Sequence, residues 1–129
     1  MAITGVYSNM SALSALSTGM QVTANNIANV NTNEFKYSRA DLETGPKDQG
    51  VYVSQIPESS AAGSLVPSLQ PVENPDTGRT TTREVMVESS NTDLAREFVN
   101  LISAQRAYEA NIAAIQTFDE LGQVVNELV

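Results

Sequence analysis

The chain has 129 residues and a formal net charge of −8, and its seven Lys and Arg residues are scattered along the sequence. This length suits one small domain with a modest hydrophobic interior, and the lack of a basic patch argues against nucleic acid as a partner. Because cysteine and histidine are both absent, disulfides, thiol catalysis and the commonest general-base and metal chemistry are excluded. We therefore predict no catalytic residue, no cofactor-binding residue and no metal site.

Aromatic residues make up 5% of the chain, and tryptophan is absent. A core of Leu, Ile, Val, Met and Ala suits helix-on-helix packing better than a thick β-sandwich. The sequence therefore predicts a mainly α, elongated fold. In this fold the N- and C-terminal helices pair as an antiparallel, coiled-coil-like hairpin, with a small β-hairpin and loop segment between them. The predicted segments are 1–33, 34–90 and 91–129.

The first predicted element is a helix over about residues 8–28. Its apolar positions recur in steps of four and three, as in a coiled-coil seam with one polar member: Val6, Met10, Leu13, Ser17, Met20, Ala24 and Ile27. No charged side chain precedes Glu34, whereas a solvated helix normally carries charge on its outer face. We expect several faces of this helix to contact protein, although an ordinary amphipathic helix on its own core would also show the stripe.

Five asparagines lie within residues 24–35, where this helix ends. Asparagine tolerates left-handed backbone dihedrals, and its amide can pair with backbone groups left open at a helix end. Asn29, Asn31 and Asn33 can therefore end the helix and redirect the chain, while Asn25 and Asn26 fall in its last turns. Local capping alone would explain the run, and packing between subunits would add a second role.

The middle segment, 34–90, is richer in charge, Gly and Pro than the first. Its turn signals lie at 45–50, 57–64 and 74–78. Strand-like composition occurs at 51–56 and 81–89, which predicts a β-hairpin or small sheet. The connection between these two runs is predicted to be a long loop.

The last predicted element is a helix over residues 93–128, about 54 Å long. Asn91, Thr92 and Asp93 supply a capping side chain and a first-turn acid. The predicted seam comprises Leu94, Phe98, Leu101, Gln105, Tyr108, Ile112 and Ile115, and then Phe118, Leu121, Val125 and Leu128. A helix this long cannot bury its stripe alone, so it needs the first helix, a neighbouring chain, or both.

Two sequence motifs resemble the bacterial flagellar rod and hook protein family. "TANNIANVNT" at 23–32, followed by Phe35 and Lys36, is similar to the family's N-terminal signature, and "NTDLAREFVNLISAQRAYEAN" at 91–111 with "IQTFDELGQVVNEL" at 115–128 is similar to its C-terminal helix. Many family members continue the first motif with Pro-Gly-Phe-Lys, whereas this chain has Asn33 and Glu34 before Phe35. The short stretch between the helices resembles that of the short proximal rod subunits.

The resemblance implies a structural, non-enzymatic subunit of the flagellar basal-body rod, which assembles helically into a torque-transmitting shaft across the periplasm. The implied partners are copies of itself, other axial proteins and the flagellar type III export apparatus. A cleaved signal peptide is not expected, because the start lacks a basic region, and no direct membrane insertion is expected, because no run approaches about 20 apolar residues. A cytoplasmic helical adaptor or flagellar export chaperone is the alternative. The predicted subunit-interface residues are Met10, Leu13, Met20, Asn25, Asn26, Ile27, Asn29, Asn31, Phe98, Leu101, Gln105, Tyr108, Ile112 and Ile115.

Overall fold

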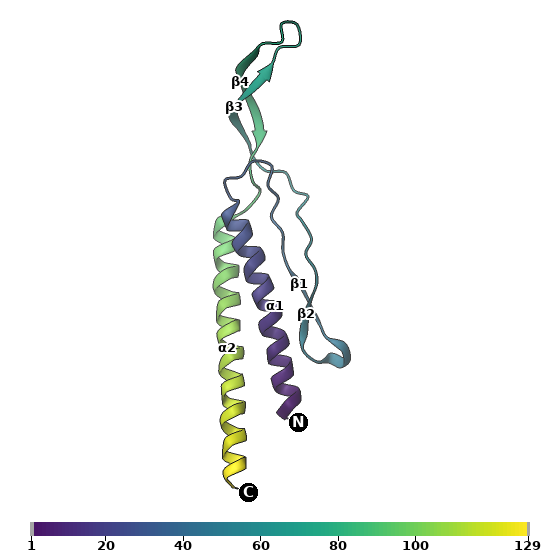
Figure 1. Ribbon diagram of the computed structural model, residues 1–129, viewed down its shortest axis with the longest axis vertical. Coiled ribbons are helices and arrows are strands. Elements are labelled where there is room, and N and C mark those ends of the chain that lie inside the picture. The colour runs from purple at the N-terminus through teal and green to yellow at the C-terminus, as the bar shows by residue number, and fades with distance from the viewer. Residues whose placement is uncertain (1, 129) are drawn as a thin grey trace.

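The computed structural model describes residues 2–128, so Met1 and Val129, which belong to the predicted segments 1–33 and 91–129, lie outside the described residues. The elements are α1 (Ala2–Ala28), β1 (Asp41–Thr44), the short 3-10 helix η1 (Pro46–Asp48), β2 (Val51–Gln55), β3 (Leu65–Glu73), β4 (Thr80–Glu88) and α2 (Leu94–Glu127). Figure 1 shows an elongated molecule with the helices at one end and the β3–β4 hairpin projecting from the other.

The two helices lie side by side and run antiparallel (Figure 1). At one end of the pair, the side chain of Asn26 donates a hydrogen bond to Glu97 across the helices. At the other end, Gly5 faces Phe118, and a Cβ atom on Gly5 would lie 3.1 Å from a ring carbon of Phe118. The glycine therefore lets the aromatic ring pack closely against the backbone of α1.

The face of α2 that packs against α1 is offset from the predicted apolar stripe. Most of its shielded positions follow steps of four and three, and Ala107 and Ala114 beside them are shielded too: Glu97, Leu101, Ala104, Tyr108, Asn111, Ile115 and Phe118. Phe98, Gln105 and Ile112 of the predicted stripe are exposed instead. Small residues explain the offset, because Ala15 on α1 is buried and small side chains permit helices to approach closely. The larger side chains then flank the contact.

Both helix ends follow local sequence signals. The helix α1 ends at Ala28, as predicted, and begins earlier than the predicted residue 8. Asp93 is the N-cap of α2, and its side chain accepts hydrogen bonds from the backbone N–H groups of Ala95 at 3.1 Å and Arg96 at 3.2 Å. The predicted cap is thus confirmed, and it satisfies two donors that a helix start leaves open.

The prediction of a mainly α fold is wrong, because strands make up about 23% of the chain and helices about 49%. Residues 2–128 form two separate antiparallel pairs, β1 with β2 and β3 with β4, where we predicted one small hairpin. The two predicted strand runs do form β2 and β4, but each pairs with a strand that the sequence did not suggest. The missed strands are the short, acidic β1 and the proline-containing β3, and both compositions count against a strand.

Two prolines fit into β3 because they face its free edge. Glu88 is opposite Leu65 in the ladder, yet its carbonyl accepts a hydrogen bond from Glu34 N at 2.8 Å, outside the ladder. Backbone groups alternate in direction along an antiparallel strand, so Pro67 and Pro71, like Leu65, direct their backbone away from β4. Proline there costs no ladder hydrogen bond, and it removes donors from the outer edge of β3.

The β1–β2 hairpin lies along α1 (Figure 1). The hydroxyl of Ser11 accepts a hydrogen bond from Val51 N at 3.0 Å. Gly50 has a φ of 71°, and a Cβ atom on it would lie 2.4 Å from the Ser11 hydroxyl. The short neutral side chains of Ser14 and Thr18 border the same contact. One uncharged face of α1 is therefore covered by the chain itself.

Very few side chains are fully buried. Among the residues whose burial is described, Ala15 and Val87 are the buried hydrophobic residues, and Asn26 and Glu97 are the buried polar ones. Many large apolar side chains on both helices and on β3–β4 are exposed. The chain therefore has a thin apolar core with a polar pair at the junction of its elements.

Candidate assembly interface

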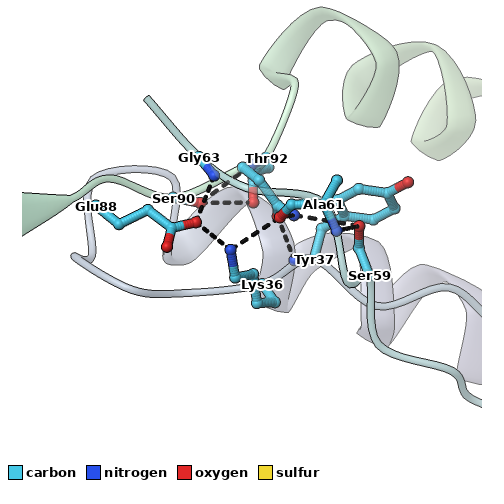
Figure 2. Close-up of polar contacts among 9 residues, drawn as sticks. Lys36, Tyr37, Ser59, Ala61, Gly63, Glu88, Ser90 and Thr92 are labelled. Carbon is cyan, nitrogen blue, oxygen red and sulfur yellow. Dashed lines mark hydrogen bonds and ion pairs between the residues drawn. The ribbon is translucent and has the colours of Figure 1, made fainter. Parts of the chain in front are cut away.

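A polar junction joins the ends of both helices to the β segments. Three stretches of extended chain meet there, at 34–38, 57–64 and 88–93, as Figure 2 shows. The hydrogen bonds between these stretches connect residues that are far apart in the sequence. The junction therefore determines how the helices and the β3–β4 hairpin are placed relative to each other.

Asn26 holds the helix pair to the chain that leaves α1. Its amide nitrogen donates to Ser38 O at 2.7 Å and to Glu97 Oε2 at 3.0 Å, and its amide oxygen accepts from Ser38 N at 2.9 Å. Asn26 is 1% exposed and Glu97 is 4% exposed. Buried polar groups are costly unless they are paired, so this pair favours one register of α1 against α2.

The other asparagines of the motif act locally or face solvent. Asn29 donates from its amide nitrogen to Asn25 O at 2.9 Å, and its amide oxygen accepts from the hydroxyl of Thr32 at 3.1 Å. Asn31 and Asn33 are exposed. Local capping therefore accounts for Asn29, while Asn26 links separate elements.

The left-handed residue of this turn is Glu34, with a φ of 62°. We expected an asparagine to take this conformation. Glu34 stands where many family members have the glycine of Pro-Gly-Phe-Lys, and glycine adopts a positive φ at little cost. The chain thus keeps the turn with a residue that is strained in it.

Glu88 and Lys36 form the ion pair at the base of the β3–β4 hairpin (Figure 2). The carboxylate of Glu88 also accepts a hydrogen bond from Gly63 N, and Lys36 donates to Ala61 O at 2.8 Å. The hydrogen bond from Lys36, followed by that from Gly63, lowers the pKa of Glu88 below its ordinary value. A Cβ atom on Gly63 would lie 2.0 Å from Ser89 O, so glycine is required for this close approach.

Asn91 connects the start of α2 to two extended stretches. Its amide oxygen accepts from Tyr37 N at 2.8 Å, and its amide nitrogen donates to Ala61 O at 2.8 Å and to the hydroxyl of Ser59 at 3.2 Å. Its backbone N–H donates to Phe35 O at 3.2 Å. Asn91 was predicted to help cap the last helix, but its side chain joins the junction instead.

The predicted interface residues fall into three groups by exposure. Asn26 is buried inside the chain. Half-buried residues are Leu13, Met20, Ile27, Asn29, Leu101, Tyr108 and Ile115. Exposed residues are Met10, Asn25, Asn31, Phe98, Gln105 and Ile112. Apart from Asn31, which lies in the turn after α1, the exposed group lies on outer surfaces of the helix pair, where a neighbouring chain could reach it.

Sequence reasoning missed Glu97 and Glu88. A stripe with regular steps of four and three runs through Glu97, Leu101 and Tyr108, so an alternative register of the last helix would have placed this glutamate among shielded residues. Glu88 has no local signal of this kind, because its partner Lys36 is 52 residues away.

Residues 2–128 contain neither a metal-binding cluster nor a helix that could span a membrane. Within residues 2–128, no group of three or more acidic side chains is placed to hold a metal ion. Neither α1 nor α2, over the same residues, has a stretch that is both long and apolar enough to cross a membrane. A partly open groove of about 490 Å³ lies between the two helices and residues 37–42, and the small residues Gly19 and Ala104 are part of its lining.

Comparison with protein families gives two matches. The model described as "Flagella basal body rod protein" matches residues 7–36, and the model described as "Flagellar basal body rod FlgEFG protein C-terminal" matches residues 84–128. These ranges contain the two motifs quoted above and, in the structure, most of α1 and all of α2. The resemblance predicted from the motifs is therefore confirmed.

Three curated relatives show how much of a longer protein the chain resembles. The flagellar basal-body rod protein FlgG of Borreliella burgdorferi is 48% identical over 46 residues, which are 36% of this chain and 17% of the relative. The FlgG protein of Agrobacterium fabrum is 38% identical over 74 residues, 57% of this chain and 26% of the relative. The flagellar hook protein FlgE of Caulobacter vibrioides is 29% identical over 97 residues, 75% of this chain and 12% of the relative. The chain thus spans about a quarter or less of these relatives.

Proposed function

Because this chain belongs to the bacterial flagellar rod and hook protein family, we propose that it is a structural subunit of the flagellar basal-body rod. Copies of the chain, together with other axial proteins, form a helical shaft that transmits torque. The observation that carries this proposal is the pair of long helices with uncovered, largely uncharged or apolar outer faces. A chain that worked alone would leave this surface in water at a cost in free energy.

The outer face of α1 is suited to packing against other helices. Tyr7 and Met10 are exposed there, and no charged side chain occurs before Glu34. Burying this face against a neighbour therefore desolvates no ion, which is the main cost of burying a helix surface. Assembly would thus account for the lack of charge on this outer face, as the chain's own β1–β2 hairpin does for the face that it covers.

The outer face of α2 carries exposed apolar side chains near both of its ends. Phe98 and Val99 are exposed near its start, and Leu121, Val124 and Val125 are exposed near its end. The two faces of the helix pair differ, so one subunit would contact the next through unlike surfaces. Contacts between unlike surfaces generate a helical filament where the rotation between subunits does not close into a ring, and a rod requires this open arrangement.

The proposal includes the route and the place of assembly. Export through the flagellar type III apparatus brings the chain to the periplasm-spanning rod without a cleaved signal peptide. We favour this role over a helical adaptor or an export chaperone, because both matching family descriptions name rod proteins. Assembly of a shaft requires no catalytic chemistry.

Deletion and fractionation in the bacterium that carries the chain test this function. Deletion should abolish or weaken motility, and the wild-type chain should be recovered in purified basal bodies. Replacing Leu13 or Ile112 with Asp should block incorporation, because each change places an unpaired charge on a surface that assembly buries. Thr77→Asp, which adds the same charge at the exposed β3–β4 turn, serves as the control. Normal rods and motility with Ile112→Asp would contradict the proposal.

A further inference from the structure

The C-terminal end of α2 extends past the start of α1 (Figure 1). Gly5 faces Phe118 where the two helices pack together. Beyond this level α1 continues for three residues, to Ala2, whereas α2 continues for nine residues, to Glu127. The overhang is therefore about six residues long, or about 9 Å of helix. Residues 119–128 are all exposed, so no other described part of the chain covers this end of α2.

The overhang carries an apolar stripe. Its members follow one another in steps of three, one and three, which places them on one side of the helix: Leu121, Val124, Val125 and Leu128. Each of these side chains is more than half exposed. Leu121 follows Phe118 by three residues, so the stripe continues the seam by which α2 packs against α1. An uncovered apolar stripe of this kind indicates a contact surface for a further helix.

The charges beside the stripe are negative. No Lys or Arg occurs within residues 107–128, and the charged side chains there are those of Glu109, Asp119, Glu120 and Glu127. Glu120 lies four residues before Val124 and Glu127 lies three residues after it, so both glutamates border the stripe. The last turn of α2 contains no basic residue, so the negative end of the helix dipole is not offset. A helix that covers the stripe is therefore favoured by positive charge.

A second copy of this chain does not offer a basic surface. Lys36 and Arg39 are held in ion pairs with Glu88 and Asp41. Each of the other five basic residues has an acidic residue within three positions in the sequence: Lys47, Arg79, Arg83, Arg96 and Arg106. Residues 2–33 carry no charged side chain, and two overhangs packed together would repel each other through their glutamates. The charges therefore favour a different protein as the partner of this surface.

Resting on the proposed function, we propose that the stripe of Leu121, Val124, Val125 and Leu128 binds a basic amphipathic helix of a different axial protein. Apolar side chains of the partner helix cover the stripe, and its Lys or Arg side chains lie beside Glu120 and Glu127. The partner segment has apolar residues at spacings of three and four, which form one side of a helix. At this end of the molecule the chain thereby joins another component of the shaft.

Binding of synthetic peptides to the purified full chain tests the chemistry of this surface. One labelled helical peptide has Leu at spacings of three and four with Lys beside them, a second has Glu in place of Lys, and a third has Ser in place of Leu. In fluorescence anisotropy at about 0.15 M salt, the Leu/Lys peptide should bind at least about tenfold more tightly than the other two. Equal binding of the Lys and Glu peptides, or no binding of any peptide, would overturn the inference.

Variants of the chain locate the surface that the Leu/Lys peptide binds. Val125→Ser removes part of the stripe and should weaken binding by about three- to tenfold. Gln123→Ser is the matched control and should leave the affinity unchanged, because Gln123 is exposed and lies about 200° around the helix from Val125. Circular dichroism should show that both variants fold like the parent chain, since both side chains are exposed. Equal affinities of Val125→Ser and the parent chain would place the peptide elsewhere and refute the inference.

A photo-cross-linking amino acid at position 125 identifies what covers the stripe in purified basal bodies. Mass spectrometry should find it linked to a segment of a different protein, in which Lys and Arg outnumber Asp and Glu. A linked segment from a second copy of this chain, or one without an excess of basic residues, overturns the inference while the rod function stands. Absence of the wild-type chain from basal bodies contradicts the proposed function, and the inference with it.

Discussion

An ordinary globular protein buries apolar side chains and exposes polar ones. The junction of this molecule instead buries a polar pair, and its outer surfaces expose apolar side chains. At the junction, Asn26 and Glu97 are buried polar side chains that bond to each other. On the outer surfaces, apolar side chains such as Leu69 and Val99 face solvent. The difference teaches that specific polar pairing fixes the shape of one chain, while much of its apolar surface is uncovered and open to the neighbouring chains of the proposed rod. Substitutions in the two regions should therefore separate folding from assembly.

The largest effect is expected from Asn26→Leu, which leaves the buried carboxylate of Glu97 without its partner. Removing one member of a buried polar pair costs about 3 kcal/mol of unfolding free energy, measured by urea denaturation followed by circular dichroism. Asn25→Ala, at the exposed neighbouring position, is the control and should change little. Adding Glu97→Leu to Asn26→Leu should recover much of the loss; equal losses for the Asn25 and Asn26 variants would refute the role of the pair.

A somewhat smaller effect is expected from Gly63→Ala at the same junction. The new Cβ atom would lie 2.0 Å from the backbone oxygen of Ser89, so the chain must shift, at a cost of about 2 kcal/mol. Gly122→Ala in α2 is the matched control, since nothing lies within 4 Å of its Cβ position. That change should raise helix stability by up to about 1 kcal/mol. In thermal denaturation, the melting temperature of Gly63→Ala should lie below that of the parent chain, and that of Gly122→Ala should lie above it.

Glu34→Gly should stabilise the chain. The left-handed conformation at φ 62° costs a non-glycine residue about 1–2 kcal/mol, and part of this gain is offset by the greater freedom of glycine in the unfolded chain. We expect a net increase of roughly 0.5–1 kcal/mol in unfolding free energy, measured by urea denaturation. A decrease would show that the Glu34 side chain contributes a contact that outweighs the backbone strain.

Acid should weaken the junction through Glu88. Its pKa is lowered in the folded chain by Lys36 and then by Gly63 N–H, so its contribution to stability is present above the ordinary pKa of a glutamate and is lost as the pH falls through the lowered value. Unfolding measured from about pH 7 down to about pH 3 should show this loss. In Lys36→Met the acid-dependent loss should be smaller, and an identical pH profile for both chains would exclude the ion pair as its cause.

The smallest effect on folding is expected from Val99→Ser on the outer surface of α2. The side chain is already 66% exposed, so the unfolding free energy should change by less than about 0.5 kcal/mol. Recovery of the chain in basal bodies should nonetheless fall, because the proposed rod buries this apolar surface of α2. A large loss of stability with unchanged recovery in basal bodies would show that Val99 contributes to folding and not to assembly.

Features that depend on nearby residues could be predicted from the sequence. Apolar periodicity and the capping side chain of Asp93 located both helices, and the turn residues located the connections of the β segments. The motif asparagines were correctly placed at the end of α1, and Asn26 among them does contact another element, although within its own chain.

Features that depend on distant residues could not be predicted in this way. The inward face of α2 depends on small residues such as Ala15 of the opposite helix. Burial of Glu97 depends on Asn26, which lies 71 residues away. The strand β3 was missed because Pro67 and Pro71 count against a strand unless one knows that both face a free edge.

These two prolines also affect what happens before a subunit reaches its final position. Unassembled copies with exposed hairpins could stack strand upon strand into a fibre, which requires a backbone donor at every second residue of the joining edge. Ring carbons replace that hydrogen at two such positions on β3, so a strand that adds to this edge lacks two of its hydrogen bonds. Aggregation by this route is thereby limited, although the apolar side chains on the hairpin stay exposed.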